Sequence, residues 1–289
     1  MRIRHLSMLS LLALSLVAAG CGDDEEPSGS GSASATPTAA AASCDKSSLE
    51  LKTDGRLTVG TDKPAFPPYF EDDDPTNGKG FESAVAYAVA EQLGFAESEV
   101  KWVTVPFNSS YAPGPKDFDF DINQISITPQ RAERVDFSEP YFTAPQAVIA
   151  PEGSPAQKAT SLAELADKKI GVQVGTTSLE AVQASIKPTE DPQVFNDSND
   201  VVRALDGNRV DAAVVDLPTA FYLTAAELEN SKIVGQFAAP GGDEWGLLLE
   251  KGSGLTDCVD EAVKTLSDEG ELKRLQDQYM GGESAPELR

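Results

Sequence analysis

The sequence predicts an α/β protein with largely parallel sheets, because two patterns recur along it. Short runs rich in β-branched and aromatic residues alternate with segments of helical apolar spacing. Polar residues repeatedly follow the strand-like runs, and α/β sheets bind ligands beyond the carboxyl ends of their strands. The part from Cys44 onward has about 245 residues, which indicates two lobes or one large domain.

The first half of this part contains one strong helix among several strands. Phe81 begins the helical spacing and Gly94 ends it. Between Phe107 and the third strand, Pro113-Gly114-Pro115 cannot continue a helix, so a loop is expected there; Tyr111 in that loop could reach a site or merely cover a lobe. Strands are predicted at 56–61, 101–105, 118–122 and 146–150.

The second half repeats the strand–helix alternation. Ser161-Leu162-Ala163-Glu164 is typical of a capping box that opens a short helix. Further helices are expected from Leu179, over 201–205, after Asp216 and over most of 257–279. Strands are predicted at 169–174, 210–215, 232–234 and 245–250.

The N-terminal segment has the pattern of an export signal. Arg2 and Arg4 precede an apolar stretch at 6–19 that is too short to span a bilayer as a stable helix. The following Ala18-Ala19-Gly20-Cys21 resembles the lipobox of bacterial lipoproteins, in which cleavage before the cysteine leaves a lipid on its thiol. Ordinary secretion with cleavage nearby is the alternative. We predict a signal peptide at 1–20 and, because 22–43 lacks large apolar residues, a disordered tether at 21–43.

Charge and histidine content exclude several classes of function. The formal net charge is −24, which argues against binding nucleic acid or anionic lipid electrostatically. His5 is the single histidine and lies in the predicted signal peptide. Ser-His or Cys-His catalysis and histidine-ligated zinc are therefore excluded for the mature chain, and we expect no metal and no cofactor.

Two of the three cysteines are expected to form a disulfide. Cys21 is taken by the lipobox, which leaves Cys44 and Cys258 as an even pair in an oxidising compartment. A bridge would tie the start of the folded part to a predicted helix. Two unpaired buried thiols are the alternative.

Seven ordered segments of the chain form a pattern: LTVGTD, GFESAVAYAVAEQLG, VKWVTVPF, FDFDINQISITPQRAERVDFSEPYF, SLAELADKKIGVQVGTTS, ALDGNRVDAAVVDLPTAFYL and GLLLEKGSGLTDCVDEAVKTLSDEGELKRLQDQYMG. In this order they resemble the extracellular solute-binding proteins of ABC importers, in the branch that binds polar amino acids. The likeness covers nearly everything from Leu57 to Gly281.

The resemblance implies a periplasmic-binding-protein type II fold with two lobes, mixed sheets flanked by helices and two hinge crossings. Lobe 1 would comprise 44–144 plus 245–289, and lobe 2 would comprise 149–242. The hinge would lie near 145–148 and 242–245. In this family the ligand lies between the lobes, which close on it.

The resemblance assigns the ligand carboxylate to Arg131, whose guanidinium can fork two N–H donors onto it. Backbone N–H groups of Thr176 and Thr177, at a helix start, would add donors for the same anion. Alternatively, Arg131 could be a surface residue paired with Glu133 or Asp136.

The ligand ammonium is assigned to Asp216, which matches the aspartate at the family's VVD strand end. Ser126 and the backbone around Gln124 would complete the polar contacts, and the large Gln124 side chain could re-aim the pocket. Asp216 could instead be a plain helix N-cap before Pro218.

The same resemblance places Phe66 and Phe107 on the two sides of the ligand's aliphatic stem, although both could be core residues. Asp62 would accept a hydrogen bond from the ligand side chain, or could only shape a turn. Glu82 is a further acidic wall, or only favours a helix N-terminus.

We therefore expect a monomeric, non-enzymatic binding protein for a free L-amino acid, with glutamine or a basic amino acid favoured. Its implied partners are an ABC permease and its ATPase, and its implied location is the outer face of the cell membrane. An enzyme on the same scaffold, similar to cyclic-acid dehydratases, and a ligand-sensing module are the alternatives.

Overall fold

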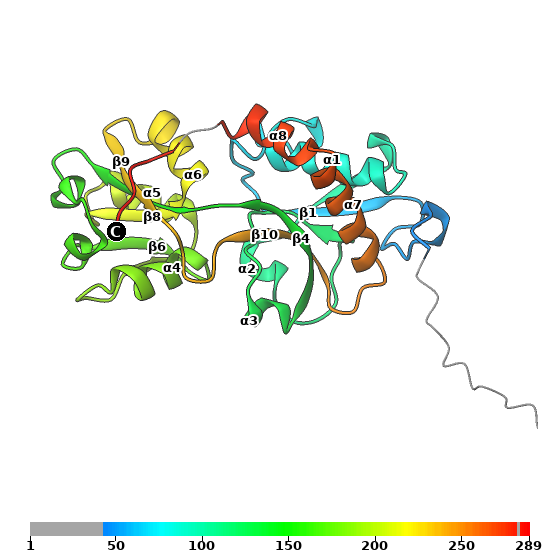
Figure 1. Ribbon diagram of the computed structural model, residues 1–289, viewed down its shortest axis with the longest axis horizontal. Coiled ribbons are helices and arrows are strands. Elements are labelled where there is room, and N and C mark those ends of the chain that lie inside the picture. Colours follow the sequence, from blue (N-terminus) through cyan, green and yellow to red (C-terminus); the bar gives the residue numbers. More distant parts are fainter. Residues whose placement is uncertain (1–42, 282–283) are drawn as a thin grey trace, which may run out of the picture. The chain divides into compact units, whose positions relative to one another are not determined.

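The computed structural model describes residues 43–281 and 284–289, which form two five-stranded mixed sheets flanked by helices (Figure 1). The predicted signal peptide, Cys21 and nearly all of the predicted tether lie outside the described residues. The predicted α/β class with mixed sheets is confirmed. Within the described residues no helix is both long enough and apolar enough to cross a membrane.

The first sheet has the strand order β2-β1-β3-β10-β4. β1 runs parallel to β2 and β3, whereas β10 runs antiparallel to β3 and β4. The strands are β1 (Leu57–Thr61), β2 (Val100–Thr104), β3 (Phe120–Asp121), β4 (Val135–Thr143) and β10 (Glu244–Glu250). The associated helices are α1 (Phe81–Gln92), α2 (Phe107–Ser110), α3 (Pro129–Ala132), α7 (Thr256–Asp268) and α8 (Glu271–Tyr279).

α1 illustrates why this part of the sequence is helical. Phe81, Val85 and Val89 recur at four-residue spacing, and all three are fully buried in the core that α1 shares with β1, β10 and α7. Gly94, in the left-handed conformation at φ +82°, follows the end of the helix. Figure 1 shows α1, α7 and α8 lying together beside this sheet.

The second sheet has the order β7-β6-β8-β5-β9, with β6 parallel to β7 and β8, and β5 antiparallel to β8 and β9. The strands are β5 (Gln146–Pro151), β6 (Ile170–Gln173), β7 (Gln193–Phe195), β8 (Ala212–Asp216) and β9 (Ser231–Phe237). The helices are α4 (Thr177–Ala181), α5 (Ser198–Asp206) and α6 (Leu217–Tyr222). π-helical turns continue α4 over Val182–Ile186 and α6 over Leu223–Glu227.

Two of the connections between the sheets lie entirely within the described residues. β4 ends at Thr143 and β5 begins at Gln146, whereas β9 ends at Phe237 and β10 begins at Glu244. The two connections touch, because Ala144 donates its N–H to the carbonyl oxygen of Asp243 at 2.8 Å.

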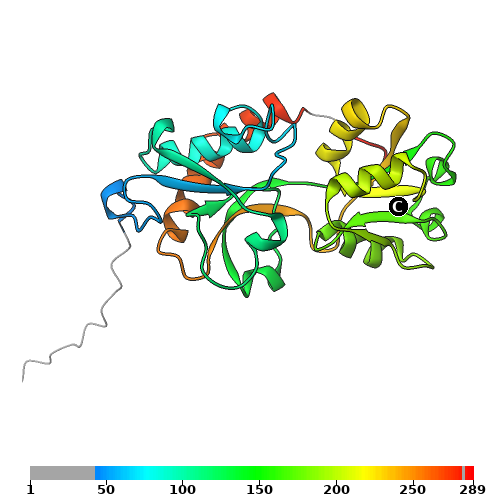
Figure 2. The same cartoon turned by 180° about the vertical axis from the view of Figure 1, so that it is seen from behind.

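The end of the chain departs from the expected lobe boundaries, which placed everything from 245 to 289 with the first sheet. Residues 284–289 lie instead along β9 of the second sheet (Figure 2). Gln236 N donates to Pro286 O at 2.8 Å, and Leu288 N donates to Gln236 O at 2.8 Å. Leu288 is 4% exposed within the core of that sheet, so burial of an apolar side chain adds to the strand-like pairing.

Three local features differ from the sequence prediction. β4 was not predicted, because it contains a proline and its burial does not alternate regularly. The third strand is only two residues long. Ser161 makes no side-chain cap; Glu164 Oε2 instead accepts from Thr160 N at 2.7 Å, and the segment forms a 3₁₀ turn at Leu162–Leu165.

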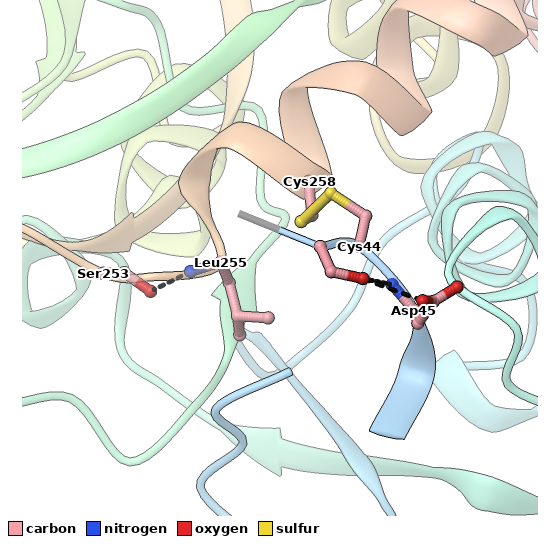
Figure 3. The surroundings of a disulfide bond; sticks show 6 residues. Cys44, Asp45, Ser253, Leu255 and Cys258 are labelled. Atoms are coloured by element: carbon pink, nitrogen blue, oxygen red, sulfur yellow. Dashed lines mark hydrogen bonds between the residues drawn. A yellow bond between two sulfur atoms is a disulfide. The ribbon is translucent and has the colours of Figure 1, made fainter. Parts of the chain in front are cut away.

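The predicted disulfide is confirmed. Cys44 and Cys258 are bridged, which ties the segment preceding β1 to α7 (Figure 3). The bridge lies against the core of the first sheet, since Cys258 is 2% exposed and belongs to that cluster. The cross-link spans a sequence separation of 214 residues.

Candidate functional site

A cavity of about 150 Å³ is lined by residues from elements of both sheets. A single water molecule needs only about 10–15 Å³, so the cavity has room for a small organic molecule. Nine of the ten ligand-binding residues expected from the sequence line it, the exception being Glu82. The nine are Asp62, Phe66, Phe107, Gln124, Ser126, Arg131, Thr176, Thr177 and Asp216.

Arg131 is a buried cation at this cavity, with 8% of its surface exposed. It lies in the short helix α3, whose cap Thr128 accepts from Arg131 N at 3.2 Å. Its guanidinium donates from Nη1 to Ser126 O at 2.7 Å and from Nη2 to Gly175 O at 3.0 Å. Among the residues that the structure describes, it forms no ion pair, so the surface-pair alternative is not observed.

Aromatic rings cover the guanidinium. Its Cζ atom lies 4.6 Å from the Tyr111 ring centroid and 5.6 Å from that of Phe107. Tyr111 OH also reaches the second sheet, donating to Gly175 O at 3.3 Å. Gly175 has φ +75°, and a Cβ there would lie 2.5 Å from both Tyr111 Oη and Asn108 Oδ1. Tyr111 therefore packs over the arginine, and the contact requires glycine at 175.

Asp216 ends β8 at the opposite sheet from Arg131. It stands at the N-cap position of α6, yet its side chain makes no capping hydrogen bond. Its Oδ1 instead accepts from Gln146 Nε2 at 2.6 Å, and the same nitrogen donates to Asp243 Oδ2 at 2.7 Å. One amide thus links two carboxylates beside the connections between the sheets.

Burial dominates the electrostatics of this carboxylate pair. It raises the pKa of Asp216 to about 7, and the Asp243 charge adds to the rise, whereas the Gln146 hydrogen bond and Arg131 oppose it. The pKa of Asp243 is also raised by burial. A cation placed beside Asp216 would favour the ionised form, so the site is suited to an ammonium group.

Hydroxyl groups join the sheets at the cavity. Ser126 Oγ lies 3.2 Å from Thr177 Oγ1, and Tyr69 Oη lies 2.8 Å from Thr219 Oγ1. Thr176 caps α4, accepting from Leu179 N at 3.3 Å. The first N–H groups of a helix have no partner inside it, so those at the start of α4 are donors for an anion near Thr177.

Glu82 lies behind the cavity wall and is completely buried. Its Oε1 accepts from Gln124 N at 2.7 Å and from Tyr141 OH at 2.5 Å, and its Oε2 accepts from Gln124 Nε2. Burial raises the pKa of Glu82 to about 7, and these hydrogen bonds oppose the rise. Glu82 therefore positions Gln124, which has the uncommon φ of +47°, rather than forming a wall of the cavity.

Both carboxylate oxygens of Asp62 already accept backbone hydrogen bonds. It lines the cavity, but its Oδ1 accepts from Lys63 N at 2.7 Å and its Oδ2 accepts from Phe107 N at 3.0 Å. Phe66 also lines the cavity, where its ring centroid lies 6.5 Å from that of Tyr222 on α6. The turn-shaping interpretation of Asp62 therefore describes its present hydrogen bonds.

Several polar residues at the site were not identified from the sequence. Gln146, Asp243, Tyr69 and Thr219 act through contacts between segments far apart in the chain, and none belongs to a local motif. The sequence offers one local signal for these residues, the Gly241-Gly242 pair before Asp243, which is typical of a turn. No group of three or more His, Cys, Asp and Glu side chains in the described ranges could hold a metal ion.

Two mixed α/β sheets with a cavity bearing a buried cation, Arg131, and a half-buried carboxylate, Asp216, define a solute-binding protein of the periplasmic-binding-protein type II class. The sequence matches the bacterial extracellular solute-binding proteins, family 3, over residues 57–282, and the chain belongs to that family. Its relatives are binding proteins, and the chain is a solute-binding protein and not an enzyme.

Similar proteins are known at sequence and structure level. The arginine-binding extracellular protein ArtP of Bacillus subtilis (strain 168) is 30% identical over 236 residues, covering 79% of this chain and 87% of ArtP. An ancestral arginine-binding protein bound to glutamine has a TM-score of 0.67 and 30% identity, covering 79% of this chain and 99% of that one. An ancestral arginine-binding protein bound to arginine has a TM-score of 0.65 and 31% identity, covering 78% of this chain and 98% of that one.

Proposed function

We propose that this chain binds a free polar amino acid between its two lobes and delivers it to an ABC-type permease. One observation carries the proposal. Arg131 on α3 beside the first sheet and Asp216 at the end of β8 in the second sheet line one cavity, and neither has an ion-pair partner among the residues described. Leaving the buried charge of Arg131 without a counter-charge is costly, and a zwitterion would compensate both it and the half-buried Asp216.

The ligand carboxylate would accept hydrogen bonds from the terminal Nη1 and Nη2 groups of Arg131. Backbone N–H groups at the start of α4 would add further donors. The ligand ammonium would lie against Asp216, with Ser126 as a further acceptor. Phe66 and Phe107 would cover the aliphatic stem, since both line the cavity. To accept a carboxylate, Nη2 of Arg131 would exchange its bond to Gly175 O for one to the ligand.

The favoured ligands are glutamine and the basic amino acids. Relatives named for arginine binding, and structures of ancestral arginine-binding proteins bound to glutamine or to arginine, support this range. The carboxylate of Asp62 at the cavity supports a ligand side chain that donates hydrogen bonds.

Closure of the lobes would couple binding to delivery. Lobe 1 would comprise 44–144 and the part from 245 to the end of α8; lobe 2 would comprise 149–242 together with 284–289, which pair with β9. The hinge would lie near 145–148 and 242–245. A ligand held by both lobes stabilises the closed arrangement, which the permease would recognise, with a cytoplasmic ATPase supplying the energy.

The protein would act as a monomer at the outer face of the cell membrane. The lipobox-like sequence ending at Cys21 supports a lipid anchor there. A tether of about 22 residues without large apolar side chains would let the folded part move relative to its permease.

A calorimetric and thermal-shift screen of the purified protein against the twenty amino acids tests the proposal. We expect a rise in melting temperature for one or a few polar amino acids and none for acetate, methylamine or other single-charge fragments. Failure of every amino acid to bind would contradict it.

A further inference from the structure

The cavity has more carboxylates than are needed to bind an amino acid with a neutral side chain. Four charged side chains line it: one cation, Arg131, and the three carboxylates Asp62, Asp216 and Glu227. If the ligand's own carboxylate and ammonium engage Arg131 and Asp216, as the proposed function on which this inference rests requires, two carboxylates remain for the side chain.

The two remaining carboxylates, Asp62 and Glu227, differ in the number of hydrogen bonds that they already accept. Each oxygen of Asp62 accepts a backbone N–H, from Lys63 and from Phe107. Glu227 accepts at Oε1 from Tyr222 OH at 2.9 Å. Within residues 43–281 and 284–289, this is the one hydrogen bond of the Glu227 side chain, so Glu227 retains more capacity than Asp62 to accept from a ligand.

Glu227 is held at the cavity by the geometry of its helix. It ends the π-helical turn Leu223–Glu227 that continues α6, the helix that begins directly after Asp216. Its bond to Tyr222, five residues earlier, directs the carboxylate back along this helix, as i and i+5 positions align in a π-helical turn. Asp216 and Glu227 thus stand at the two ends of one helical segment, and both line the cavity.

An aromatic pair accompanies this carboxylate. The Tyr222 ring lies 6.5 Å from the ring of Phe66, which belongs to the loop after β1 of the first sheet. Aromatic faces attract cations, and a guanidinium can stack on such a ring while its N–H donors engage a carboxylate. The surroundings of Glu227 therefore suit an extended cationic group better than a neutral amide.

We propose that Glu227, supported by Tyr222, is a specificity-determining residue that recognises the distal positive charge of a basic amino acid. The cavity accordingly takes arginine or lysine in preference to glutamine. The neutral analogue citrulline has nearly the shape of arginine but lacks the charge, so the arginine-to-citrulline affinity ratio measures this recognition directly.

The test is isothermal calorimetry of the purified protein with arginine, citrulline and glutamine, for the wild type, Glu227→Gln and Tyr222→Phe. Glu227→Gln should weaken arginine binding about threefold to fivefold and citrulline binding less than about twofold, as expected for loss of one exposed charge-assisted contact. Tyr222→Phe should lower the same ratio by a smaller factor.

Glu229→Gln is the matched control, because Glu229 is exposed two residues away and does not line the cavity. It should leave the ratio unchanged. Equal weakening of arginine and citrulline in Glu227→Gln, or no weakening of either, would overturn the role of Glu227. Absence of binding of any amino acid to the wild type would instead contradict the proposed function itself.

Discussion

Arg131 donates an N–H to the carbonyl oxygen of Gly175 across the two sheets, at 3.0 Å. The contact places a cation of the first sheet against the loop that precedes α4 of the second. Because the partner is a neutral carbonyl, the guanidinium charge remains uncompensated, and burial lowers the pKa of Arg131. An anion at this place would be attracted by the positive charge of Arg131 and could accept two parallel hydrogen bonds from its guanidinium.

Replacing Arg131 by alanine should weaken amino-acid binding at least about tenfold, because a charge-assisted, two-donor contact contributes more than about 1.4 kcal/mol. Arg131→Lys should also bind weakly, since an ammonium cannot reproduce the fork. Calorimetry measures both affinities, with circular dichroism to verify folding.

Arg134→Ala is the control for this change. Arg134 is exposed, three residues away, and does not line the cavity. Binding by Arg131→Ala at close to wild-type affinity would be incompatible with the carboxylate role.

Amino-acid affinity should depend on pH through Asp216, whose pKa is raised to about 7 by burial and by Asp243. The ammonium needs the ionised carboxylate, so the complex holds fewer protons than the free protein. Affinity should therefore rise with pH up to about 7, by at most about tenfold per pH unit, and level off above it.

Calorimetry between pH 5.5 and 8.5 measures this profile, and two buffers of different ionisation enthalpy report the proton released at pH 6. Asp216→Asn should bind weakly and show little of the pH dependence. A wild-type affinity that is constant over this range would contradict the assignment of Asp216.

Glu82 should make the unfolding free energy fall as pH rises. Its folded-state pKa of about 7 exceeds its usual 4.5, because burial outweighs the hydrogen bonds from Tyr141 and Gln124. The folded protein thus holds the proton more tightly than the unfolded chain. The stabilisation is complete below pH 4.5 and is lost by about pH 7, with a magnitude of roughly 3 kcal/mol.

Urea unfolding at several pH values compares the wild type with Glu82→Gln. The difference in unfolding free energy between them should change across pH 4.5–7, whatever the average stability of the variant. Parallel profiles would mean that Glu82 does not titrate in this range.

Reduction of the Cys44–Cys258 disulfide should lower the melting temperature. The bridge closes a loop with a sequence separation of 214 residues. In the chain-entropy treatment, releasing a loop of this length costs roughly 5 kcal/mol of unfolding free energy. Thermal unfolding with and without reductant measures the loss.

The double variant Cys44→Ser/Cys258→Ser is the control, and its melting temperature should not respond to reductant. Two free thiols titrated in the oxidised, denatured wild type would exclude the bridge in solution.

The sequence alone was sufficient for the features that depend on local chemistry. Apolar spacing located α1, Pro113-Gly114-Pro115 lies in a loop as expected, and the even pair of exported cysteines is bridged. The resemblance, carried by ordered local segments, indicated the two-sheet fold and nine of the residues that line the cavity.

Only the tertiary structure decided which charges have partners. In the sequence Glu82 is an acidic residue at the start of a helix. In the structure it is buried and accepts hydrogen bonds from Gln124 and Tyr141, which are 42 and 59 residues away. Gln146 joins Asp216 to Asp243 over separations of 70 and 97 residues, and the final residues pair with β9 instead of the first sheet. Hydrogen bonding and burial between distant segments determine these roles, and no pattern of neighbouring residues encodes them.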